Sequence, residues 1–273
     1  MMKRPNNSRN LDMAIRRITE SEKEFVRYRT TMANVVVAQM LPNGVVKGGT
    51  ALKIRFGNAE TRFTTDLDTA RAEDTDAFIE ELDSRLAQGW EGFTGRVVTR
   101  KPATPKSVPP QYVMQPFDIK MSYIGRSWCT VQLEVGHNEI GDADEPERFM
   151  SRDIANMFLT LGFPEPGPIP LMPLRHQIAQ KLHGLSEPGS GRVHDLVDLQ
   201  LIMRDESIDL AEVRSTCERL FSYRQAHGWP CSINAASDWA SIYGEASDGL
   251  TVIQDVDEAV AWANVLVRKI EGA

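Results

Sequence analysis

The chain has 273 residues, of which 41% are hydrophobic and 25% are charged, and its formal net charge is −7. This composition is typical of a globular protein with a sizeable core and excludes a disordered or fibrous chain. Three cysteines without a CxxC pair argue against a zinc site or a disulfide framework, and the acidic balance counts mildly against a nucleic-acid-binding protein.

The chain carries no sign of a membrane or secretory segment. No stretch approaches the roughly 20 consecutive apolar residues that a membrane helix needs. The basic N-terminal segment is not followed by the apolar core of a secretory signal. We therefore expect a cytoplasmic protein with no membrane partner.

In chain order, helical spacing of apolar residues predicts a helix over residues 11–40, and two short strands follow at 50–56 and 62–70. A helix over 74–90, a strand over 93–101 and a proline-rich loop over 102–116 come next. Two strands at 117–125 and 127–136 precede an acidic and proline-rich linker over 139–173. Beyond it, apolar spacing predicts helices at residues 174–185, 192–205, 210–227 and 255–270.

This order predicts an α+β fold with a mixed sheet and flanking helices, followed by a helical C-terminal half. We expect a first domain over residues 1–145. The second domain, over residues 146–273, is expected to be mainly helical and to complete a cleft with the first.

Residues 44–50 almost fit a phosphate-binding P-loop, but the lysine of that motif is missing after the glycines. Gly48 and Gly49 still allow a phosphate to approach backbone amides, and Thr50 adds a hydroxyl. A plain tight turn is the simpler interpretation of these three residues taken alone.

Asp66 and Asp68 are two residues apart on a predicted strand and therefore project from the same face. Adjacent carboxylates repel each other unless a cation lies between them, and Mg²⁺ is held by one or two carboxylates together with substrate phosphates. For a third carboxylate we prefer Glu134 over Asp118, because Glu134 is an isolated acid between apolar neighbours on its strand.

In the helical half, Lys181 lies on one predicted helix, and Asp195 and Asp198 lie three residues apart on the face of the next. His194 and Asp198 are four residues apart and could pair. A surface helix with local ion pairs is an equally good interpretation of this spacing.

Taken together, Gly48-Gly49-Thr50, the segment Arg62-Phe63 followed by Asp66 and Asp68, Lys181, and the Asp195/Asp198 helix resemble the AbiEii/AbiGii toxin family. The similarity extends over residues 30–265. This family belongs to the polymerase-beta-like nucleotidyltransferases and includes toxins of abortive-infection and toxin–antitoxin systems.

The resemblance implies a Mg²⁺-dependent enzyme that uses a nucleoside triphosphate. Asp66 and Asp68 would hold the metal, and Glu134 would help to activate the attacking hydroxyl. Lys181 would reach the triphosphate, with Asp195 holding the lysine or the nucleotide and Asp198 supporting it. The residues that it places at the nucleotide are Gly48, Gly49, Thr50, Arg62, Thr64 and Asp198.

The resemblance further implies transfer of a nucleotide, often a pyrimidine, to an RNA, with the 3′ end of tRNA as the favoured acceptor, so that aminoacylation is blocked. A winged-helix antitoxin is the expected partner. The chain departs from the family pattern at His194, which stands where an arginine usually precedes the first aspartate. This leaves open which residue contacts the triphosphate.

Three alternatives stay open. The chain could transfer a nucleotide to a protein hydroxyl, or it could be a non-catalytic nucleotide-binding module. It could also be an HD-type metal phosphohydrolase, with His176, His183 and the His194-Asp195 pair as ligands. This last alternative leaves the glycine turn and the aspartate pair unexplained.

Overall fold

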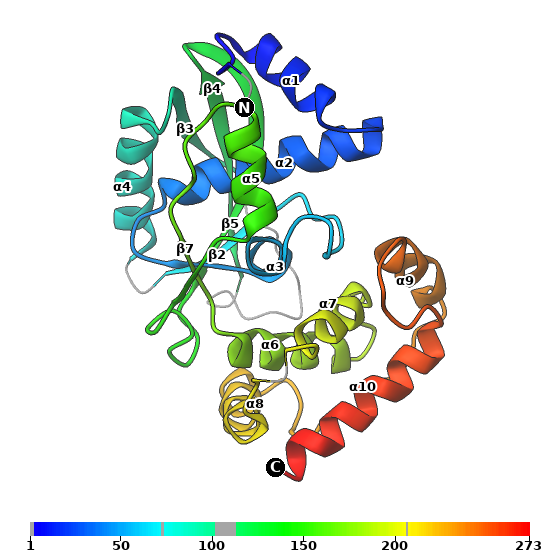
Figure 1. The fold of residues 1–273 in the computed structure, drawn as a ribbon. Coiled ribbons are helices and arrows are strands. Elements are labelled where there is room, and N and C mark those ends of the chain that lie inside the picture. The colour runs from blue at the N-terminus through cyan, green and yellow to red at the C-terminus, as the bar shows by residue number, and fades with distance from the viewer. Residues whose placement is uncertain (1–2, 72–73, 102–112, 206) are drawn as a thin grey trace. The chain divides into compact units, whose positions relative to one another are not determined.

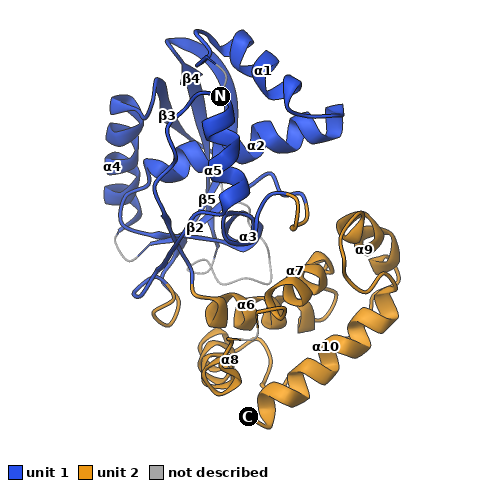
Figure 2. Ribbon diagram, viewed as in Figure 1, with its two compact units in different colours: residues 1–58, 63–138, 143–172 blue, residues 59–62, 139–142, 173–273 orange. Residues whose placement is uncertain are grey.

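The computed structural model describes residues 3–71, 74–101, 113–205 and 207–273. The chain divides into two compact units (Figure 2). The first, called the sheet unit, comprises residues 1–58, 63–138 and 143–172. The second, called the helical unit, comprises residues 59–62, 139–142 and 173–273. The domain division that the sequence predicts at residues 145/146 stays a prediction.

Within the described residues, seven strands of the sheet unit form one mixed sheet in the order β3-β4-β5-β2-β1-β7-β6 (Figure 1). The strands are β1 (Val45–Lys47), β2 (Leu67–Arg71), β3 (Phe93–Thr99), β4 (Gln115–Tyr123), β5 (Arg126–His137), β6 (Glu147–Phe149) and β7 (Ile169–Leu171). The helices of this unit are α1 (Ser8–Arg17), α2 (Glu22–Gln39), α3 (Gly48–Phe56), α4 (Thr75–Gln88) and α5 (Arg152–Thr160).

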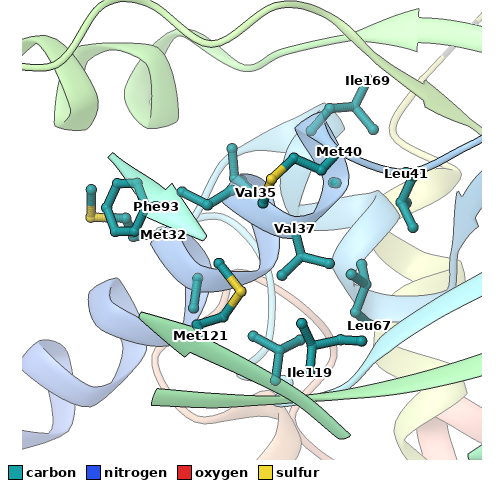
Figure 3. Packing of buried hydrophobic residues seen from close by; sticks show 14 of the residues in the cluster. Met32, Val35, Val37, Met40, Leu41, Leu67, Phe93, Ile119, Met121 and Ile169 are labelled. Atoms are coloured by element: carbon teal, nitrogen blue, oxygen red, sulfur yellow. The ribbon is translucent and has the colours of Figure 1, made fainter. Parts of the chain in front are cut away.

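The core of the sheet unit forms around α2 (Figure 3). Its buried Met32, Val35 and Val37 belong to the same apolar cluster as Leu67 and Ile119 of the sheet. The helix begins at Glu22 because the Ser21 side chain accepts a hydrogen bond from the Glu24 amide at 3.1 Å. The single helix predicted over residues 11–40 is therefore two helices, since this cap starts a new one.

The sheet has one apolar and one polar face. Alternate residues of β4 and β5 are buried, as at Ile119 and Leu133, because successive side chains of a strand point to opposite sides. The residues between them form what we call the polar face, defined by Asp68, Arg96, Asp118, Lys120, Gln132 and Glu134. Strand pairing places these residues in neighbouring positions across β3, β4, β5 and β2.

The strand predicted over residues 50–56 is wrong, because this segment forms α3. The chain pairs as β1 over Val45–Lys47 and turns at Gly48, whose φ of 65° favours glycine. Ala51, Leu52 and Ile54 are buried on several sides of the helix, so their spacing shows no amphipathic period.

The linker predicted over residues 139–173 is also wrong, since it contains β6, α5 and β7. Ile154, Met157 and Phe158 recur at helical spacing and are buried in the core of the sheet unit. The local proline and acid content concealed this pattern. Of the proline-rich loop predicted over 102–116, residues 102–112 lie outside the described part of the chain.

The helical unit contains α6 (Leu174–Ser186), α7 (His194–Ile202), α8 (Leu210–Arg224), α9 (Trp239–Ser247) and α10 (Val256–Glu271). Helix α6 packs against α7 and α8, and α9 is a helix that the sequence pattern did not predict. The predicted fold class, an α+β chain with a mixed sheet followed by a helical half, is confirmed. None of the described helices combines the length and apolar character needed to cross a membrane.

Candidate active site

Three carboxylates converge at the centre of the sheet. Strands β2 and β5 are parallel neighbours, and Asp68 lies directly beside Glu134 in their register. Asp66 lies one residue before the start of β2. Burial raises the pKa of Glu134, and the charges of Asp68 and Asp66 raise it further. The three acids are therefore close enough to repel each other electrostatically.

The first turn of α3 lies against this carboxylate group. Strand β1 pairs with β2 so that Lys47 lies opposite Asp68, and Gly48 follows at once. A Cβ atom on Gly48 would overlap Oδ2 of Asp68, so only glycine fits here for steric as well as conformational reasons. The first backbone amides of a helix lack intrahelical partners and attract anions, so Gly48 and Gly49 lie where phosphates are expected to bind.

Thr50 is buried, and its contacts fix the segment before Asp66. Its hydroxyl donates to the Asp66 carbonyl at 2.7 Å and accepts from Nδ2 of Asn34 at 3.3 Å. Asn34 also donates to the Thr65 carbonyl at 3.3 Å. The predicted phosphate contacts of Thr50 and of the half-buried Thr64 stay predictions.

Asn34 is not among the site residues predicted from the sequence. Its signal was available, because a lone amide within the apolar run 32–38 of a buried helix needs a hydrogen-bonding role.

The donor set at the carboxylates fits a hard cation such as Mg²⁺, because two carboxylates face an anion-binding helix start. Among the described residues, no group of three or more His, Cys, Asp or Glu side chains is arranged to hold a metal ion on its own. Mg²⁺ commonly takes its remaining ligands from substrate phosphates and water, so a site of this kind is completed by the nucleotide.

A second cluster lies within the helical unit and is held by buried ion pairs. Lys181 of α6 donates to Asp195 Oδ1 at 2.8 Å and to Asp198 Oδ2 at 2.6 Å. Arg62 binds both oxygens of Asp198, at 2.9 and 3.0 Å, and Arg192 donates to Asp195 Oδ2 at 2.7 Å. Lys181, Asp195 and Asp198 are at most 3% exposed. The structure therefore brings four of the predicted site residues together in one network.

Both aspartates of this cluster are ionised. Burial alone would raise the pKa of Asp195, but Arg192 and Lys181 lower it well below its usual range. For Asp198, Arg62 and Lys181 likewise outweigh burial and lower the pKa. No local pattern indicates that Arg62 pairs with Asp198, since the two are separated by 136 residues.

His194 is neutral near pH 7, because burial and the charge of Arg62 lower its pKa to about 4. A neutral imidazole cannot offset phosphate charge. Arg192 supplies a guanidinium two residues earlier, paired with Asp195 and with a side chain that is 54% exposed. The charge that the family motif carries immediately before its first aspartate is thus present at Arg192.

We expect acid to destabilise the protein between pH 6.5 and 4. Burial lowers the pKa of His183 to about 3 from its usual 6.5, so in this window the unfolded chain binds protons that the folded chain does not. The free energy of unfolding must then fall as the pH falls. Urea unfolding at several pH values measures this slope. His183→Gln should reduce the slope, and an unchanged slope would contradict a buried neutral His183.

Within the part of the chain that the structure describes, His176, His183 and the His194-Asp195 pair do not form a metal-binding group of an HD-type phosphohydrolase. His183 lies against Phe221 and His227, with its Nδ1 3.4 Å from Arg224. His194 lies 3.9 Å from Asp195, whose oxygens are occupied by Lys181 and Arg192. A metal ion would be repelled by the Arg224 guanidinium beside His183. Next to His194, the Asp195 carboxylate is already ion-paired and does not offer a free ligand.

Parallel strands that carry adjacent carboxylates beside a glycine-initiated helix fit an enzyme of metal-assisted phosphoryl transfer. A family model described as nucleotidyl transferase AbiEii toxin of type IV toxin–antitoxin systems matches residues 32–262, and the chain belongs to this family of toxin nucleotidyltransferases. The predicted family resemblance is confirmed.

Solved structures with the same fold include MenT4, a nucleotidyltransferase toxin from Mycobacterium tuberculosis. It is 17% identical, the match covers 96% of this chain and 97% of that chain, and the TM-score is 0.53. JHP933 from Helicobacter pylori is 16% identical over 92% of this chain and 93% of that chain, with a TM-score of 0.48. A search of curated proteins found no match.

Proposed function

We propose that this toxin nucleotidyltransferase transfers a nucleoside monophosphate, with a pyrimidine base, from a nucleoside triphosphate to an RNA, and that its acceptor is the 3′ end of tRNA. The observation that supports transfer most directly is the position of Asp68 beside Glu134, with Asp66 and the first turn of α3 next to them. We place the reaction in the cytoplasm, with a winged-helix antitoxin as the partner.

In this reaction the acceptor hydroxyl attacks the α-phosphorus, the bond to the pyrophosphate breaks, and the hydroxyl proton passes to Glu134. A raised pKa makes Glu134 a better proton acceptor. Mg²⁺, held by Asp66 and Asp68, would neutralise charge on the triphosphate. The amides of Gly48 and Gly49 orient its phosphates.

Lys181 is proposed to stabilise the leaving pyrophosphate. Asp195 and Asp198 accept hydrogen bonds from its ammonium and hold it in one position. Arg62 and Arg192 balance the two aspartates, so the cluster retains net positive charge. A nucleotide-bound structure in which Lys181 makes no contact with the triphosphate would exclude this role.

Basic residues of the sheet unit are proposed to hold the RNA. These are Arg96, Arg100, Lys101, Lys120 and Arg126, together with Lys106, which lies outside the described residues. Arg96 and Lys120 are neighbours on the polar face that also carries Glu134, and Arg100 is 46% exposed. Contacts to phosphates give affinity without sequence specificity.

Incubation with each labelled nucleoside triphosphate and total RNA tests this proposal. We expect label on RNA, and we expect the Arg100→Glu/Lys101→Glu variant to label it at least about tenfold less at low salt, because two phosphate contacts become repulsive. The variant's salt dependence should be shallower than the parent's, while its nucleotide affinity is unchanged.

Two results would count against an RNA acceptor. The first is that the charge-reversed variant labels RNA to the same extent as the parent. The second is that label enters protein and not RNA. The second result would favour a protein hydroxyl as the acceptor. If no label enters RNA or protein, a non-catalytic nucleotide-binding module would be favoured.

A further inference from the structure

A cavity of about 260 Å³ lies in the sheet unit between α2 and β5. We call it the Asn34 cavity. Its lining includes Thr30 and Asn34 of α2, Thr65, and Thr130 and Gln132 of β5. Binding pockets for drug-sized ligands are about 300–1,000 Å³, so this cavity has room for one small planar group and not for a whole nucleotide.

The cavity adjoins the carboxylate group at two points. The Thr65 hydroxyl donates to Oδ1 of Asp66 at 3.0 Å. Gln132 lies two residues before Glu134 on the same face of β5, a separation of about 7 Å at the rise of a strand. A ligand in the cavity therefore lies on the strand of the proposed proton acceptor.

The buried side chain of Asn34 leaves an acceptor unused. Its Nδ2 donates to Thr50 and to the Thr65 carbonyl, and the hydrogen of the Thr50 hydroxyl is already given to Asp66. Reversing the amide would place an oxygen against two acceptors, so the network fixes the orientation. Asn34 is only 2% exposed, so its Oδ1 is buried, and this oxygen has no hydrogen-bond partner among the described residues.

The main chain of β5 offers further hydrogen-bonding groups at this cavity. Strand β2 pairs with β5 only from Leu133 onward, so in the described residues no strand pairs with residues 129–132 on that side. The Glu134 carbonyl accepts from the Thr69 hydroxyl of β2 at 3.2 Å, so the main-chain groups of Glu134 point to this side. Alternation along the strand then gives residues 132 and 130 the same orientation. Thr130 and Gln132 therefore present N–H and C=O groups along the open edge.

We propose that the Asn34 cavity binds the base of the terminal nucleotide of the RNA acceptor, an inference that rests on the nucleotidyl transfer proposed above. A nucleobase edge carries adjacent donors and acceptors that match the main-chain N–H and C=O groups of β5, and Asn34 lines the opposite side of the cavity from α2. Arg29, which also lines the cavity, is neutralised by Asp12 at 2.9 Å, so the site suits an uncharged base better than a phosphate. With its base here, the terminal nucleotide would place its 3′ hydroxyl near Glu134.

Binding of labelled single-stranded RNAs that differ only in the 3′-terminal base tests the inference, with the full chain and fluorescence anisotropy as the readout. We expect the parent to prefer one terminal base by about tenfold, the discrimination of one good base contact. Thr30→Phe introduces a ring into the lining from α2 and should reduce the preference to less than about twofold. Ser127→Phe, an equal change at an exposed position of β5 outside the lining, should retain it.

Gln132→Ala is a milder second variant, and it should weaken the preference if Thr30→Phe fails to fold. Equal binding of all four RNAs by the parent would overturn the inference. A terminal-base preference that survives both substitutions would also overturn it. The same holds if the variants change which nucleoside triphosphate the enzyme selects and leave the terminal-base preference unchanged. Failure of the proposed function is seen separately, as absence of label on RNA in the transfer assay.

Discussion

Replacing Asp68 by asparagine should abolish nucleotide transfer, with a loss of at least about a thousandfold, because charge stabilisation by a bound metal is worth several kcal/mol. The same result is expected for Asp66→Asn. The fold should persist, since removing one acid relieves repulsion with Glu134. The thermal midpoint of the metal-free variant should therefore be level with the parent's or higher. Transfer assays and thermal unfolding measure the two effects.

Asp118→Asn is the matched control for this prediction. Asp118 lies on the same polar face, opposite Gln132 on the neighbouring strand, and pairs with Lys120 at 2.8 Å. It should retain transfer within a fewfold of the parent, whereas Glu134→Gln should lose most of it. Normal transfer by Asp68→Asn, or a loss with Asp118→Asn as large as that with Asp68→Asn, would contradict the assignment of the metal-binding pair.

Replacing Lys181 by methionine should cost about 3–5 kcal/mol of unfolding free energy, because it leaves two buried carboxylates with one cationic partner fewer. Lys181 is 3% exposed, so solvent cannot replace the lost contacts. Transfer by the fraction that remains folded should fall strongly as well. Urea unfolding and transfer assays at a temperature where the variant is folded measure the two effects.

Lys269→Met makes the same change at an exposed position of α10 and should alter stability by less than about 0.5 kcal/mol. The double variant Lys181→Met/Asp195→Asn should be less unstable than the sum of its single variants, because each removes the other's partner. Additive losses would show that the Lys181–Asp195 contact does not contribute as inferred.

The sequence by itself determined many of the local elements, though not those at residues 50–56 and 139–173, and it supplied the candidate site residues as predictions. The helix predicted over residues 74–90 is α4, which the Asp74 side chain caps at its start and Gly89, with a φ of 81°, ends. Alternation defined β4 and β5, and an acid among apolar neighbours singled out Glu134. Caps and periodicity depend on residues close in the chain, so one sequence is sufficient to reveal them.

Only the tertiary structure decided which of these residues meet. It showed that residues 50–56 form a helix, because burial on several sides removes any amphipathic signal, and that α5 lies within a segment whose composition predicts a linker. It also paired Arg62 with Asp198, gave His194 a lowered pKa, and left an unused acceptor on Asn34 beside an open strand edge. Contacts between distant residues, and the burial that shifts a pKa, depend on packing of the whole unit and leave no local pattern in the sequence.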